Sequence, residues 1–133
     1  MFKWYFKLFC SRFNNSKIFS IIFSPFAFLL GLTGKDAMYV AELMGIKITT
    51  NEFVAMMDLK SNLKSLQPHT IAVATTFLAS FANFSTVGMI YGTYNSLFGG
   101  EKSSIIGKNV WKLLVSGMAV SLLSAMLVGL FVW

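Results

Sequence analysis

One apolar run, residues 70–92, most constrains what this chain can fold into. It reads TIAVATTFLASFANFSTVGMIYG, and a helix of roughly 20 apolar residues is long enough to cross the hydrocarbon of a bilayer. Near its centre the run nevertheless carries four polar side chains, those of Ser80, Asn83, Ser85 and Thr86. Lipid cannot satisfy a hydroxyl or an amide, so protein or water must face these groups.

Two interpretations of this polar centre stay open on the residues alone. Ser, Thr and Asn often hydrogen-bond a neighbouring transmembrane helix, and in that case the run forms one continuous spanning helix. Alternatively, the helix is broken near Asn83 and its half-helix ends line a polar cavity, as in transporters with discontinuous helices. The second interpretation predicts a binding site at membrane depth.

The composition identifies a membrane protein. Of the 133 residues, 56% are hydrophobic and 12% are charged, against roughly 25% charged residues in an average soluble domain. The net charge of +6 does not indicate nucleic-acid binding, because Lys and Arg flank apolar runs instead of forming a stripe on a polar domain. The single cysteine excludes an internal disulfide, and no Cys/His cluster has metal-ligand spacing. We therefore expect neither a metal site nor a cofactor, and we expect His69 in a loop at a helix entrance.

The N-terminal part of the chain predicts elements that do not span a membrane. Residues 1–16 mix Lys and Arg with aromatic side chains, in an order that fits an interfacial segment and not a cleavable signal peptide. Residues 17–33 are apolar but short for a span, and Pro25 removes a backbone donor from their interior. We expect an interfacial or kinked helix there.

Residues 36–59 predict a re-entrant helical hairpin. Two half-length apolar segments meet at residues 45–47, where we expect the division, and neither segment can cross a membrane alone. Thr50 or Asn51 can cap the second arm, and a carboxylate in its first turn, Glu52, is favoured by the helix dipole. Capping is one interpretation of Glu52, and a ligand-binding carboxylate at membrane depth is the other. We expect Glu42 to be structural.

The C-terminal part of the chain predicts a loop and a transmembrane helix. Residues 95–112 contain glycines and charges that are typical of a loop, and residues 113–133 are an uncharged run of spanning length. We place the final membrane element at residues 105–133. Lysines crowd its start and no charge follows it, so the positive-inside rule puts its start in the cytoplasm.

Two sequence blocks resemble the C-terminal part of the concentrative nucleoside transporter family. The first is GIKITTNEFVA at residues 45–55, and the second is FANFSTVG at residues 81–88, followed by Ser-Gly at residues 116–117 in the last apolar run. Their order and spacing are specific. The similarity extends from about residue 17 to the end, and residues 1–16 show none.

The resemblance implies an all-α membrane fold, the second half of an inverted-repeat transporter. Its parts would be an interfacial helix at 17–33, a re-entrant hairpin at 36–59, a broken helix at 68–98 and a transmembrane helix at 105–133. The family moves nucleosides inward with a Na⁺ or H⁺ gradient, as a homotrimer. The resemblance therefore implies nucleoside symport by a multi-pass protein of the plasma membrane.

The resemblance also implies a substrate site. By matching position, Glu52 and Asn83 would hydrogen-bond the ribose hydroxyls. Phe81 would pack on the sugar, Thr86 would add a contact, and Ser85 beside it completes the expected substrate-binding set. The chemistry agrees, because a carboxylate accepts from two hydroxyls and an amide both donates and accepts.

The chain also departs from the family pattern. Ser80 stands where the family commonly has Gly, and Thr86 where it commonly has Ser. The first hairpin and first broken helix, which contact the nucleobase and hold the coupling Na⁺ or H⁺, have no counterpart. We therefore expect a truncated transporter that is inactive alone and whose partner is the missing N-terminal half. A small self-assembling membrane protein is the alternative, and one His, one Cys and no paired carboxylates leave little chemistry for an enzyme.

Overall fold

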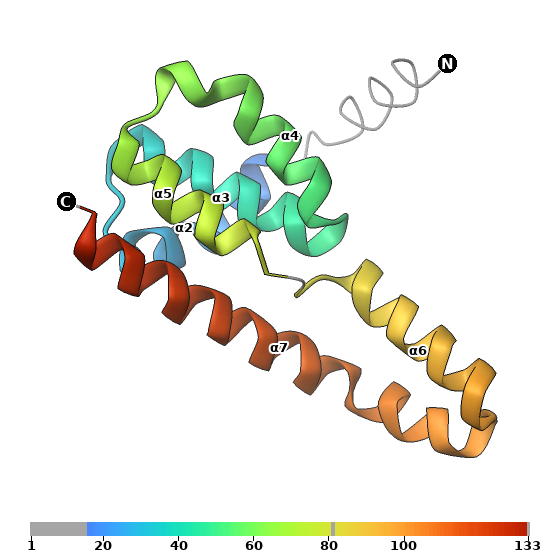
Figure 1. The fold of residues 1–133 in the computed structure, drawn as a ribbon. Helices are drawn as coiled ribbons and strands as arrows, with labels where there is room; N and C mark the ends of the chain where they lie inside the picture. Colours follow the sequence, from blue (N-terminus) through green and yellow to red (C-terminus); the bar gives the residue numbers. More distant parts are fainter. Residues whose placement is uncertain (1–15, 81, 133) are drawn as a thin grey trace, which may run out of the picture.

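The chain folds entirely into helices over the residues that its computed structural model describes, 16–80 and 82–132 (Figure 1). This confirms the all-α fold class. In chain order the elements are α2 Ser16–Leu29, α3 Gly34–Thr49, α4 Glu52–Asn62, the short 3₁₀ turn η1 Leu63–Ser65, α5 Pro68–Leu78, α6 Phe84–Phe98 and α7 Gly100–Phe131. Phe81 and most of the segment 1–16 lie outside the described residues.

α2 is the expected short apolar helix, and it tolerates Pro25 because a side-chain hydroxyl replaces the backbone N–H that proline lacks. Proline has no N–H to donate to the carbonyl four residues earlier. That carbonyl, Ile21 O, instead accepts a hydrogen bond from Ser24 Oγ at 3.0 Å. The chain then turns through Gly31 and Gly34, both at positive φ (80° and 62°), a conformation that glycine adopts without strain. The α2–α3 pair is bent by 115° as a result.

The hairpin is formed by α3 and α4, but the predicted division at residues 45–47 is wrong. α3 runs unbroken through these residues, and the chain reverses at Asn51. Gly45 lies inside α3, and a glycine is needed there because a Cβ would overlap the Cβ of Phe19 in α2. Lys47 also lies inside α3, and its buried side chain reaches α5. Both residues serve packing between helices and do not end one.

The close approach at Gly45 gives a stability prediction. Gly45→Ala is expected to lower the free energy of unfolding by about 1–3 kcal/mol, because the added methyl overlaps Phe19. Gly88→Ala is the matched control, since nothing lies within 4 Å of a Cβ at this helical glycine. Alanine there should leave stability unchanged or raise it by up to about 1 kcal/mol. Thermal unfolding of the purified chain in detergent measures both variants, and equal shifts would contradict the close α2–α3 contact.

The central apolar run is broken, as the second interpretation of its polar centre predicted. α5 begins at Pro68, as expected of a proline in a first turn, and ends at Leu78, while α6 begins at Phe84. His69 therefore lies in the first turn of α5 and not in a loop, with Nδ1 3.0 Å from Val132 O. The interpretation as one continuous spanning helix is wrong.

The predicted loop at residues 95–112 is also wrong, because one residue makes the turn. α6 continues to Phe98, Gly99 has φ 76°, and α7 starts at the next residue. The Gly99 N–H donates to Asn95 O at 3.1 Å and closes the end of α6. The charges in this region, such as Lys108, therefore sit on an exposed helix surface. Among the described residues, one helix is long and apolar enough to cross a membrane, Ser104–Phe131 with 28 residues. A second span is added if the bent α2–α3 pair counts as one.

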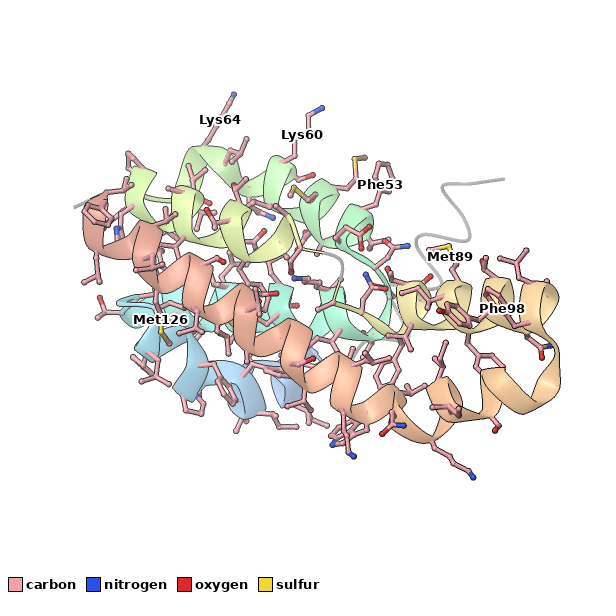
Figure 2. All side chains as sticks on the ribbon, turned by 60° about the horizontal axis from the view of Figure 1, so that its bottom comes forward. Phe53, Lys60, Lys64, Met89, Phe98 and Met126 are labelled. Atoms are coloured by element: carbon pink, nitrogen blue, oxygen red, sulfur yellow. The ribbon has the colours of Figure 1, made fainter. Side chains whose placement is uncertain are left out.

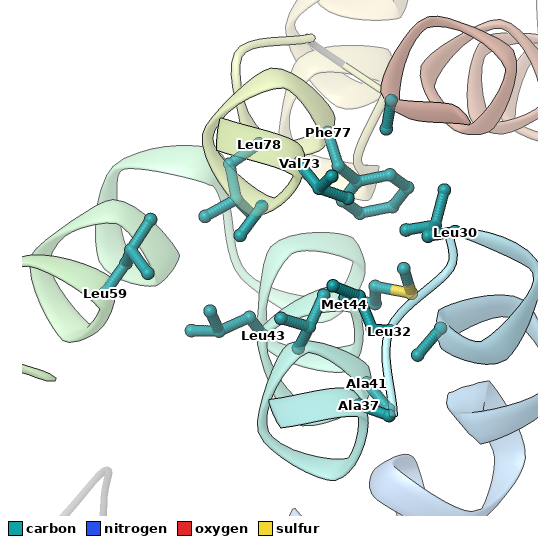
Figure 3. Close-up of a cluster of buried hydrophobic side chains, with 14 of the residues drawn as sticks. Leu30, Leu32, Ala37, Ala41, Leu43, Met44, Leu59, Val73, Phe77 and Leu78 are labelled. Carbon is teal, nitrogen blue, oxygen red and sulfur yellow. The ribbon is translucent and has the colours of Figure 1, made fainter. Parts of the chain in front are cut away.

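The core lies between α3 and α5 and is closed by α2 and the C-terminal half of α7 (Figure 3). Phe77 and Leu78 of α5 face Leu43 and Met44 of α3 across this core. Two hydrogen bonds add to the packing around α3: Thr70 Oγ1 donates to an Asp36 carboxylate oxygen at 2.6 Å, and Asn62 Nδ2 donates to the Tyr39 hydroxyl at 3.1 Å.

α6 and the first half of α7 form a helical pair that extends away from this core (Figure 1). Its surface is apolar: Met89 and Phe98 are 63% and 51% exposed, and Met89 points outward in Figure 2. The opposite end of α7 is also apolar outside, with Leu130 71% exposed. Such surfaces suit contact with lipid or with further membrane helices.

Candidate functional site

Two helices begin next to each other with the same capping residue. The side chain of Asn51 caps α4 by accepting from Val54 N at 2.9 Å. The side chain of Asn83 caps α6 by accepting from Thr86 N at 2.7 Å. Each asparagine has extended backbone, as an N-cap residue requires, and satisfies one of the amide groups that a helix start leaves without a partner. The hairpin turn and the break in the central run therefore have the same local chemistry.

A hydrogen bond joins these two helix starts. Asn83 Nδ2 donates to Glu52 Oε2 at 2.5 Å, across 31 residues of sequence. Asn83 is 0% exposed, and Glu52 is half-buried in the first turn of α4. A hydrogen bond from an amide to a carboxylate is stronger than one between neutral groups. The structure thus brings together the two residues that the sequence singled out from separate segments.

The side-chain cap of α4 does not come from Glu52. The sequence left capping of α4 open as its role, but Asn51 is the residue that caps this helix. The positive end of the α4 dipole stabilises the Glu52 carboxylate, which also accepts a hydrogen bond from the side-chain amide of Asn83. The carboxylate therefore lies at the meeting point of two helix starts, where a negative charge is favoured.

The pair retains hydrogen-bonding capacity on both side chains. Within the described residues, Glu52 accepts one hydrogen bond through Oε2, which leaves Oε1 as an acceptor. Asn83 uses Oδ1 for the cap and one Nδ2 hydrogen for Glu52, which leaves the second Nδ2 hydrogen as a donor. An acceptor and a donor side by side can engage two neighbouring hydroxyl groups, each of which donates and accepts.

The other expected site residues are Thr86, Ser85 and Phe81. Thr86 and Ser85 lie in the first turn of α6, with Thr86 partly exposed and Ser85 exposed. Phe81 lies outside the described residues. Ser80 belongs to another group of contacts, because its hydroxyl meets Lys47 and Ser121.

Sequence reasoning missed the role of Lys47. Its ammonium is 1% exposed and donates to Phe77 O at 2.5 Å and to Ser80 Oγ at 2.6 Å. A signal was present, because a charged residue inside an apolar membrane segment usually marks a functional site. Treating residues 45–47 as the hairpin turn left Lys47 outside a helix, and its partners, Phe77 and Ser80, lie 30 and 33 residues away in the sequence.

Comparison with known proteins places the chain in a family. The family model described as the C-terminus of the Na⁺-dependent nucleoside transporter matches residues 1–129. This range includes residues 1–16, for which the sequence analysis found no resemblance. The purine nucleoside transport protein NupG of Bacillus subtilis is 79% identical over 116 residues, which are 87% of this chain and 29% of NupG.

A human protein and a solved structure extend the comparison. Human sodium/nucleoside cotransporter 1 is 37% identical over 128 residues, which cover 85% of this chain and 20% of that protein. The structure of CNTnw in an inward-facing substrate-bound state has a TM-score of 0.82 at 28% identity and covers 89% of this chain and 30% of that one. This chain therefore spans less than a third of each of these three proteins. The match over nearly its whole length shows that it is a membrane protein that belongs to the family of Na⁺-dependent nucleoside transporter C-termini.

Proposed function

We propose that this chain supplies the ribose-binding part of a cation-coupled nucleoside transporter, with Glu52 and Asn83 as the ribose ligands. The observation that carries the proposal is the hydrogen bond of 2.5 Å between Asn83 Nδ2 and Glu52 Oε2. It holds a carboxylate and an amide together at the hairpin turn and at the helix break, which are the two interruptions at which transporters of this general design bind substrate.

The remaining hydrogen-bonding groups of the pair match a ribose. Glu52 Oε1 accepts from one of its two neighbouring hydroxyls, and the second Nδ2 hydrogen of Asn83 is donated to the other. Thr86 and Ser85 add polar contacts from the first turn of α6, and Phe81, two residues before the cap, packs on the sugar.

The proposal includes parts that this chain does not contain. The nucleobase and the coupling Na⁺ or H⁺ are bound by a further hairpin and broken helix, and the complete transporter is a homotrimeric, multi-pass protein of the plasma membrane. The names of the relatives support nucleoside transport for those proteins, with a purine nucleoside for NupG and sodium for the human protein. The cytoplasmic position of the start of α7 stays a prediction.

Uptake of labelled nucleoside tests the proposal. We define the NupG chimera as NupG with its matching segment replaced by this chain, which is 79% identical there. In a transporter-deficient bacterial strain, the chimera is expected to concentrate adenosine or guanosine. The chain expressed alone should insert into the membrane without concentrating nucleoside, because it contributes only one side of the site. Concentrative uptake by the isolated chain, or an inserted but inactive chimera, would contradict the proposal.

A further inference from the structure

Lys47 is a buried cation that the proposed ribose site does not use. Its side chain is 1% exposed and lies among the largest fully buried side chains of the described residues. Burying an ammonium is costly unless hydrogen bonds replace its water. The Nζ atom donates to Phe77 O and to Ser80 Oγ, and it lies 4.3 Å from the centroid of the Phe77 ring. The chain therefore provides specific partners for this charge.

These partners lie at the break in the central run. Phe77 is in the last turn of α5, where carbonyl groups lack partners within the helix and the helix dipole is negative. Ser80 lies in the break itself, between the end of α5 and the start of α6. Half-helix C-termini of this kind are where transporters with broken helices coordinate cations. In this chain a cation is supplied there by a side chain of α3.

The contact continues from the break to α7. The hydroxyls of Ser80 and Ser121 form a hydrogen bond, and Ser121 Oγ donates to Gly117 O at 2.8 Å. Because the Ser121 hydrogen is used for this carbonyl, Ser80 donates to Ser121 and accepts from Lys47. α7 also approaches the break closely, since a Cβ at Gly117 would lie 2.9 Å from the Cβ of Ala82. The break is thus held by α3 on one side and by α7 on the other.

We propose that the Lys47 ammonium occupies the position of a bound cation at the break between α5 and α6, and that Lys47 is thereby a positioning residue for the ribose site. By fixing the end of α5 and Ser80, it fixes the path of the chain to Asn83 and so the position from which Asn83 bonds Glu52. Lys47 itself contacts no substrate. The inference rests on the proposed function of Glu52 and Asn83, so it needs a measurement that does not depend on transport.

Hydrogen exchange of the purified chain in lipid nanodiscs provides that measurement. Lys47→Met keeps a long, flexible apolar stem and removes the donors. We expect amide exchange to rise roughly ten- to a hundred-fold over residues 79–88, the factor that corresponds to losing a hydrogen bond to a charged group. Residues 53–62 of α4 and 122–131 of α7 should be unchanged. A uniform rise along the chain would show that Lys47 is only a part of the core and would overturn the proposal.

Two further variants make the measurement specific. Lys60→Met is the matched control, because Lys60 is exposed and points away from the helices in Figure 2, and it should change no segment. If Lys47→Met does not accumulate in the membrane, Ser80→Ala tests the same contacts, since it removes one acceptor of Lys47 and the bond to Ser121. We expect a smaller rise in exchange that is confined to residues 79–88, and no rise there would overturn the proposal.

Uptake by the NupG chimera separates this inference from the proposed function. Lys47→Met is expected to raise the apparent KM for nucleoside about tenfold, because the ligand Asn83 loses its fixed position. Unchanged exchange over residues 79–88 overturns the role of Lys47, whatever the uptake shows. Raised exchange with an unchanged KM overturns the link between the break and the ribose site, and it counts against Asn83 as a ligand.

Discussion

Glu52→Gln in the NupG chimera is expected to raise the apparent KM for nucleoside roughly ten- to a hundred-fold, without loss of membrane insertion. The change removes the charge and preserves the shape. A hydrogen bond to a charged group is worth about 1.5–3 kcal/mol, and each 1.4 kcal/mol is a factor of about ten in affinity. Glutamine can still accept from Asn83 Nδ2 through its amide oxygen, so the contact between hairpin and break is kept, while its NH₂ group, a donor, replaces the acceptor proposed for ribose.

The control for this variant is Glu42→Gln, which neutralises a carboxylate that we regard as structural. It lies in α3, in the same hairpin, and has no role in the proposed site, so the apparent KM should stay within about twofold. If Glu52 only favoured the start of α4, Glu52→Gln would cost about 0.3–1 kcal/mol through the dipole and would leave affinity unchanged. Equal KM values for the wild type and Glu52→Gln would therefore remove Glu52 from the ribose site.

The features that could be predicted from the sequence are those with local causes. The start of α5 at Pro68 and the cap of α4 depend on a few consecutive residues: α5 begins where it was expected, and Asn51 is one of the two residues expected to cap α4. The break near Asn83 was one of two interpretations, because the same polar residues can also bond a neighbouring helix. The choice needed the structure, in which α5 and α6 are separate helices.

The errors concern residues whose partners are distant in the sequence. Gly45 resembles a turn residue until Phe19 is seen against it, and Lys47 resembles a surface residue until its bond to Phe77, 30 residues away, is known. The predicted loop at 95–112 failed for a different reason. Charged residues mark either a loop or an exposed helix surface, and a single turn residue, Gly99, is enough to reverse the chain.

The candidate site was partly predictable, because it combines features with local causes and contacts between distant residues. Glu52 and Asn83 each attracted attention in their own segments, as a carboxylate at a helix start and an amide in an apolar run. Only a family resemblance suggested that they act on one ligand. Their direct hydrogen bond depends on how α4 and α6 are placed by α3 and α7, and that placement cannot be read from either segment.

Asn83→Asp is expected to reduce the apparent affinity of the NupG chimera for nucleoside by at least about a hundred-fold. Aspartate caps a helix as well as asparagine does, so Thr86 N keeps its acceptor and α6 keeps its start. The variant instead replaces the Nδ2 donor by an oxygen, at the atom that now lies 2.5 Å from Glu52 Oε2. Two carboxylates at this distance repel each other, and the donor proposed for the ribose hydroxyl is lost as well.

Asn51→Asp is the matched control, because it makes the same chemical change at the same structural position of the other helix start. Asn51 caps α4 through Val54 N, and among the described residues its amide nitrogen donates to no other side chain. Its replacement should keep the cap and leave the apparent KM within about twofold. If the two variants behaved alike, Asn83 would act only as a cap. A large loss confined to Asn83→Asp would arise from the exchange of Nδ2 for a carboxylate oxygen, at the atom of the side chain that faces Glu52.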